Sequence, residues 1–105
     1  MEIPEKQKRL AKFWKKFLRL TRGRVTVLRA LALAEEEEKD PAFKKAVHAL
    51  RQTVEAGSPL SDALKKHPAE FSPSIIELIK TAEKSGAWDD ILPEIVEGLE
   101  EGTFD

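Results

Sequence analysis

The chain has 105 residues, of which 41% are hydrophobic and 35% charged, and its formal net charge at pH 7 is −1. This length and composition are typical of one small globular domain with a modest core. The absence of cysteine excludes disulfides, thiolate metal sites and a cysteine nucleophile, and it fits a reducing compartment. The N-terminal residues lack the apolar run of a signal peptide, and no stretch approaches the ~18 apolar residues of a membrane span.

The first helix is predicted over residues 5–20, because apolar residues recur there at helical spacing. They are Leu10, Phe13, Trp14 and Phe17. The other faces are basic and carry Lys8, Lys12, Lys15, Lys16 and Arg19. Either the aromatic residues are core and the lysines a solvated face, or this amphipathic helix lies on an anionic membrane or in a partner's groove. Gly23 is the predicted C-cap.

A second helix is predicted from Thr26, its N-cap, to Lys39. Its last turns carry the run Glu35-Glu36-Glu37-Glu38. Adjacent helical residues point about 100° apart, so four in succession do not converge on one ion. The run is therefore interpreted as a solvated helix end.

Proline and glycine mark the next three helices. Asp40-Pro41 is typical of an N-cap followed by the first helical residue, and the helix that it opens is predicted to end at Gly57. Ser58 or Ser61 is predicted to cap a short fourth helix that runs through Lys66 and stops at His67-Pro68. Ser72-Pro73 then opens a fifth helix, with Gly86 as its C-cap.

The sixth helix has a regular apolar period but contains Pro93. A proline in a helix interior removes a hydrogen bond and costs ~3 kcal/mol. Placing Pro93 in the first turn avoids this cost, so Asp89 or Asp90 is the predicted N-cap and Trp88 the connection. The acidic tail, residues 101–105, is predicted to fray.

These patterns predict an all-α protein: a six-helix bundle in a single domain, residues 1–105, with a core at 13–100. A weak internal echo places Gly23 seven residues before Leu31 and Gly57 six before Leu64, counting only those between. The echo is consistent with two similar antiparallel three-helix halves.

Charge is strongly segregated along the chain. Residues 1–29 contain ten Lys or Arg and two acids, whereas residues 83–105 contain eight acids and one lysine. Either the two ends lie side by side and compensate each other, or the basic end binds a partner. One such partner is nucleic acid, contacted through Arg9, Lys12, Lys16, Arg19, Arg22 and Arg24.

No motif for catalysis is present. His48 and His67 are 19 residues apart, without the spacing of a zinc site. The chain has no nucleophile elbow and no glycine-rich phosphate loop. We therefore predict that the protein is not an enzyme, has no small-molecule substrate and needs no cofactor.

Two segments, Leu60-Ser61-Asp62-Ala63-Leu64 and Ala82-Glu83-Lys84-Ser85-Gly86, carry a family signal. With the residues around them the chain resembles the cytoplasmic F-domain of the inner-membrane platform proteins of type II secretion and type IV pilus systems. The similar positions are Phe13, Phe17, Leu20, Gly23, Ala30, Leu31, Pro41, Gly57, Leu60, Ser61, Ala63, Leu64, His67, Pro68, Phe71, Ser72, Pro73, Ala82, Glu83, Ser85, Gly86, Asp89 and Leu92. The chain departs from the pattern by one extra residue between Gly23 and Ala30, by Trp88 in place of a leucine, and by Pro93.

The resemblance implies a bundle of two related three-helix halves and a non-enzymatic role. It also implies contact with the assembly ATPase and other platform subunits, a homodimer among the possibilities, and a location at the cytoplasmic face of a bacterial inner membrane. Members of the family carry two such domains and three membrane helices, so this chain is expected to be a fragment or a stand-alone domain. It would then meet the membrane through flanking segments or by peripheral contact. Lys12, Lys16, Arg19 and Arg22 are the predicted partner-binding residues.

The joint between the fifth and sixth helices allows one further hypothesis. Glu83, Asp89 and Asp90 could hold a hard cation such as calcium through their oxygens. In the alternative interpretation, Glu83 and Asp89 cap and tie the turn.

Overall fold

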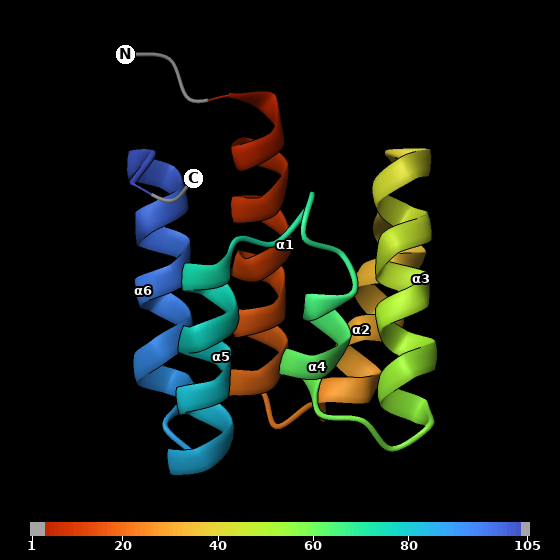
Figure 1. The fold of residues 1–105 in the computed structure, drawn as a ribbon, viewed down its shortest axis with the longest axis vertical. Helices are drawn as coiled ribbons and strands as arrows, with labels where there is room; N and C mark the ends of the chain where they lie inside the picture. The colour runs from red at the N-terminus through yellow and green to blue at the C-terminus, as the bar shows by residue number, and fades with distance from the viewer. Residues whose placement is uncertain (1–3, 104–105) are drawn as a thin grey trace.

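Six α-helices form the protein in the computed structural model, which describes residues 4–103 (Figure 1). They are α1 (Glu5–Arg22), α2 (Val27–Glu37), α3 (Pro41–Glu55), α4 (Leu60–Lys65), α5 (Pro73–Ser85) and α6 (Trp88–Glu101). No strand occurs within residues 4–103. The all-α prediction is confirmed, and each helix lies within a few residues of its predicted place.

Three helices begin at the side-chain caps that the sequence predicts. The Thr26 hydroxyl accepts a hydrogen bond from the Arg29 N–H at 3.2 Å. Asp40 accepts one from Phe43 at 2.8 Å, and Ser72 accepts one from Ile75 at 3.4 Å. Proline follows both Asp40 and Ser72, where its missing N–H is not needed by the helix.

The predicted cap of α4 is wrong. The N-cap residue is Pro59, and neither Ser58 nor Ser61 caps the helix with its side chain. Ser61 is instead the second residue of α4. Its N–H and its hydroxyl both donate hydrogen bonds to Glu83 of α5, at 2.9 and 2.6 Å. A carboxylate from another helix thus replaces a local cap, because it accepts a hydrogen bond from an N–H group that has no partner within the first turn of α4.

The predicted start of α6 is also wrong. The helix begins at Trp88 after Ala87, so Pro93 lies inside it, in its second turn. The Ala87 carbonyl accepts hydrogen bonds from both Asp90 and Ile91, which closes the first turn. Trp88 packs against the core, with its ring 6.4 Å from that of Phe17. The helix therefore includes Trp88, and Pro93 leaves the carbonyl of the exposed residue Asp89 without its usual helical hydrogen bond.

The connections that follow α1 and α3 have the same backbone hydrogen bonds. After α1, Arg24 donates to Thr21 and Val25 donates to Leu20. After α3, Gly57 donates to Val54 and Ser58 donates to Thr53. Both are Schellman motifs, whose left-handed residue is Arg24 (φ 65°) in the first and Gly57 (φ 106°) in the second.

This equivalence explains the uneven echo in the sequence. Gly23 is the C-cap residue of α1, as predicted, but its own φ is −81° and the left-handed position passes to Arg24. Counted from Arg24 and from Gly57, Leu31 and Leu64 are equally far along the chain. The matched turns relate α1–α2 to α3–α4, and not one three-helix half to the other. The two three-helix halves are compatible with the fold and stay a prediction.

Each helix packs against the helices before and after it in the chain, and α6 returns to pack against α1. Within residues 4–103 the six helices therefore close a ring of neighbours. In Figure 1, α1 runs through the middle of the view, α6 and α3 flank it, and the last residues of α6 lie at the same end as the first residues of α1. At the C-terminal end, Glu101 still belongs to α6 and Thr103 donates to the Gly98 carbonyl, while residues 104–105 lie outside the described part.

An aromatic cluster fills the middle of the ring. Phe13 of α1 contacts the rings of Trp14, Phe17, Phe43 and Phe71, with centroids 5.0 to 6.3 Å apart. Phe71 is fully buried although it lies in the α4–α5 connection. The cluster joins α1, α3 and this connection, so the buried face of α1 is core and its other faces remain for the surface.

Candidate docking surface

The side of α1 that faces away from the core is basic. Lys12, Lys15, Lys16 and Arg19 lie three, four and seven residues apart, a spacing that places them on neighbouring faces of one helix. Lys12, Lys15 and Arg19 are exposed, whereas the Lys16 side chain is only 21% exposed. Burial of Phe13, Trp14 and Phe17 on the opposite side fixes the direction in which these cations point.

These cations line a groove between α1 and the end of α2, with a volume of about 360 Å³. Its lining residues are Lys12, Phe13, Lys15, Lys16, Arg19, Ala34, Glu37, Glu38 and Lys39. Lys16 donates a hydrogen bond to Glu37 within the groove. That hydrogen bond, with the charge of Lys16, lowers the pKa of Glu37 below its ordinary value, so Glu37 is a carboxylate at neutral pH.

The structure places three of the four predicted partner-binding residues together. Lys12, Lys16 and Arg19 line the groove, whereas Arg22 is exposed one turn further along α1 and does not line it. The prediction missed Lys15 and Lys39. The helical spacing with Lys12 and Arg19 was enough to find Lys15, but Lys39 joins the groove only because α2 folds back along α1.

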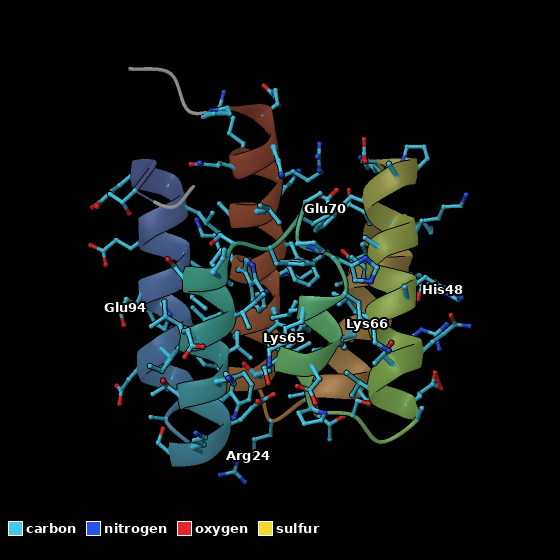
Figure 2. The ribbon with its side chains drawn as sticks, viewed as in Figure 1. Arg24, His48, Lys65, Lys66, Glu70 and Glu94 are labelled. Atoms are coloured by element: carbon cyan, nitrogen blue, oxygen red, sulfur yellow. The ribbon has the colours of Figure 1, made fainter. Side chains whose placement is uncertain are left out.

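The acidic C-terminal helix lies beside the basic first helix. Lys15 of α1 and Glu100 of α6 form an ion pair at 3.7 Å, with both side chains more than half exposed. The remaining acids of α6 are exposed, and Figure 2 shows Glu94 pointing away from the bundle. The two ends of the chain therefore do lie side by side, but only this one ion pair joins the two helices within the described residues.

The acids of the predicted cation site differ in their surroundings. Both Glu83 oxygens accept hydrogen bonds from Ser61, so this carboxylate ties α5 to α4. Asp89 and Asp90 are exposed in the first turn of α6. No group of three metal-ligating side chains comes together in the part of the chain that the structure describes. The calcium site stays a prediction, which a calcium titration followed by the melting temperature tests.

The glutamate run at the end of α2 makes more contacts than a solvated helix end would. Glu35 accepts hydrogen bonds from Arg51 at 2.7 Å and from His48 at 2.8 Å, and Glu38 accepts one from the Asp40 N–H at 3.0 Å. Figure 2 shows His48 on the outer side of α3. Only Glu36 points to solvent without a contact of this kind among those described, and the four side chains diverge as the helical spacing predicts.

Burial and hydrogen bonding oppose each other at Glu35. Partial burial raises the pKa of this carboxyl, but the hydrogen bonds from Arg51 and His48 outweigh burial and lower the pKa below 4.5. The same contact raises the pKa of Arg51. The network holds α2 against α3 and so fixes one wall of the basic groove.

Within residues 4–103, none of the helices combines the length and the apolar character needed to cross a bilayer. The longest helix, α1, is the basic helix described above.

Comparison with known proteins finds one matching family. The sequence model of the family described as "Type II secretion system (T2SS), protein F" matches residues 13–103. This range begins at Phe13, the first residue of the resemblance noted in the sequence, and includes all six helices in whole or in part.

Several curated relatives are similar to the chain. It is 33% identical over 93 residues to the type IV pilus assembly protein PilC of Thermus thermophilus, which covers 89% of the chain and 23% of that protein. It is 31% identical over 80 residues to PilC of Myxococcus xanthus, covering 76% of the chain and 19% of that protein. It is 31% identical over 72 residues to the type II secretion system protein F of Xanthomonas campestris, covering 69% of the chain and 18% of that protein. The chain thus spans about a fifth of the length of these relatives.

Proposed function

Because the chain belongs to the family of type II secretion system protein F, we propose that it is a non-enzymatic docking module of a secretion or pilus platform. In this proposal it contacts the assembly ATPase or other platform subunits. It does so at the cytoplasmic face of a bacterial inner membrane, which it meets through flanking segments or by peripheral contact. The names of the relatives, which place them in type IV pilus assembly and type II secretion, support the choice of machinery.

The observation that carries the proposal is the basic groove on α1. The apolar side of α1 is buried in the core, so its exposed basic side chains Lys12 and Arg19 face solvent and are accessible to a partner. Five cations line the groove, against two carboxylates. A concave surface with this excess of charge attracts an anionic partner over several ångströms and orients it.

Capture of the partner by a charge-reversed variant tests the proposal. The variant Lys12→Glu, Arg19→Glu, Arg22→Glu should no longer capture the purified assembly ATPase encoded in the same genome, while its circular dichroism and melting temperature stay unchanged. The control is Lys44→Glu, Lys84→Glu, which alters two exposed lysines on α3 and α5 that lie outside the groove. If the α1 variant still captures the ATPase as well as the unchanged chain does, α1 is not the docking surface.

The alternative function, nucleic-acid binding by α1, predicts a different result. Binding to a DNA duplex that depends on phosphate contacts falls steeply as salt rises. Absence of DNA binding at low salt, with capture of the ATPase retained, would exclude this alternative.

A further inference from the structure

We propose that the groove of α1 binds a carboxylate-bearing segment of the partner, and that Glu37 occupies this site in the free protein as an internal competitor. The inference rests on the docking function proposed above and names the chemistry of the partner.

The contact between Lys16 and Glu37 shows that the groove already holds a carboxylate in the free protein. Lys16 is the recessed cation of the groove, with a side chain 21% exposed, and its hydrogen bond goes to Glu37. Glu37 is the last residue of α2, and its own side chain is 58% exposed. A carboxylate that comes from outside can therefore replace Glu37 on Lys16 without disturbing the core, because Glu37 can turn into solvent.

The charge around Lys16 is a second observation that supports the proposal. Besides Lys16, the cations Lys12, Lys15, Arg19 and Lys39 line the groove. Of the two carboxylates in the lining, Glu38 already accepts the N–H of Asp40 at 3.0 Å. When Glu37 is displaced, the recessed lysine is left with four further cations around it, a setting that favours one or more incoming carboxylates.

The shape of the groove decides between classes of partner. A flat bilayer or a duplex contacts protruding side chains, whereas Lys16 lies below Lys12, Lys15 and Arg19, as their exposures indicate. The aromatic residues of α1 are buried, and the one large exposed apolar side chain among the described residues is Leu28, on α2. Helix α1 therefore presents no exposed large apolar side chain that could insert into a membrane. An acidic peptide segment can place a single carboxylate on Lys16 and others on the rim.

A fluorescent short peptide of alternating glutamate and glycine is the probe, with a glutamine–glycine peptide as its control. Fluorescence anisotropy should show binding of the glutamate peptide to the unchanged chain. The variant Lys12→Gln, Arg19→Gln should bind it about tenfold more weakly, because two exposed charge contacts are lost. The matched variant Lys44→Gln, Lys84→Gln has the same net charge and should bind the peptide as the unchanged chain does.

Glu37 provides the sharper test, because Glu36 is its neighbour on α2 and does not line the groove. Both Glu37→Gln and Glu36→Gln remove one negative charge. Glu37→Gln should strengthen binding about threefold, since it frees Lys16, and Glu36→Gln should change it little. An equal gain in the two variants would mean that net charge alone governs binding, and would overturn the competitor role of Glu37.

Other outcomes bear on the proposal or on the docking function separately. Preference for vesicles containing phosphatidylglycerol, or for a DNA duplex, over the glutamate peptide would overturn the peptide assignment. Self-association in analytical ultracentrifugation that competes with peptide binding would also overturn it, because the acidic α6 of a second copy would then be the occupant of the groove. Capture of the ATPase through α1 without peptide binding would refute this inference and leave the docking function standing. Peptide binding that depends on Glu37, without capture of the ATPase, would keep this inference and rule out the ATPase as the partner.

Discussion

Arg24 holds a backbone conformation that side chains other than glycine rarely adopt. Its φ of 65° belongs to the left-handed region, which costs a residue with a β-carbon ~1–2 kcal/mol. The equivalent residue after α3 is Gly57, which avoids this cost. Figure 2 shows the Arg24 side chain extending from the end of the bundle, and it is exposed, so no packing compensates the strain locally.

Replacing Arg24 by glycine should therefore stabilise the protein. We expect Arg24→Gly to raise the free energy of unfolding by about 0.5–1 kcal/mol, after subtracting the greater entropy of glycine in the unfolded chain. Gly57→Ala is the matched reverse and should lower it by about 1 kcal/mol, because an added β-carbon meets nothing within 4 Å and only the strain counts. Urea unfolding followed by circular dichroism measures both. A loss of stability in Arg24→Gly would show that Arg24 makes a favourable contact that outweighs its strain.

At the scale of the helix, the sequence correctly predicted those helix starts that depend only on residues nearby in the chain. Asp40-Pro41 and Ser72-Pro73 cap α3 and α5 as expected, because a cap needs only a side chain and an N–H three residues away. The starts of α4 and α6 were wrong because residues distant in the chain decide them. Glu83 reaches α4 from α5, and Trp88 is held by the core.

The same distinction applies to the candidate site. The cations of α1 were predictable because helical spacing alone gathers them. Lys39 and Glu37 were not, because their place depends on how α2 packs against α1. Phe71 lies in a connection without periodicity, so its complete burial also went unpredicted as a core position. Ser61 was predicted only as a local cap and Glu83 only as part of the α5–α6 joint, so their hydrogen bond to each other, between two separate segments, was not predicted.

The contact of α2 with α3 through Glu35 should make stability depend on pH. The pKa of Glu35 is lower in the folded protein than its ordinary value of 4.5. The stabilisation is therefore complete above that value and is lost as the pH falls through the lowered pKa. We expect Glu35→Gln to cost about 1–2 kcal/mol at neutral pH, where two charge-assisted hydrogen bonds are removed. The difference from the unchanged chain should shrink on acidification below 4.5.

Unfolding in urea at a series of pH values measures this difference. Glu36→Gln, on the same helix, removes an exposed carboxylate. Its difference in unfolding free energy from the unchanged chain should not depend on pH in this way. If the cost of Glu35→Gln stays constant down to acid pH, then Glu35 stabilises the α2–α3 contact by packing and not by its charge.

At the scale of the whole molecule, the closed ring of helices joins the ends of the chain. Since α6 packs on α1, the basic and acidic ends lie next to each other without neutralising the groove. The groove lies on the α2 side of α1. Of the cations that line it, only Lys15 also forms an ion pair with Glu100 of α6. The fold thus keeps an excess of positive charge at one place on a protein whose net charge is −1. That local excess makes selective binding of an acidic partner physically reasonable.

The aromatic cluster should make this ring unfold as one unit. Phe13 contacts aromatic rings from α1, α3 and the α4–α5 connection, so loosening it affects distant parts of the chain together. We expect Phe13→Leu to lower the free energy of unfolding by about 1–3 kcal/mol, because a smaller side chain of another shape leaves the cluster underpacked. Leu28→Ala removes an exposed side chain and should cost much less. Circular dichroism reports the helices, and fluorescence reports Trp14 in the core and Trp88 at its edge. The two urea transitions should coincide in both variants, and separate transitions in Phe13→Leu would show that part of the ring folds independently of the cluster.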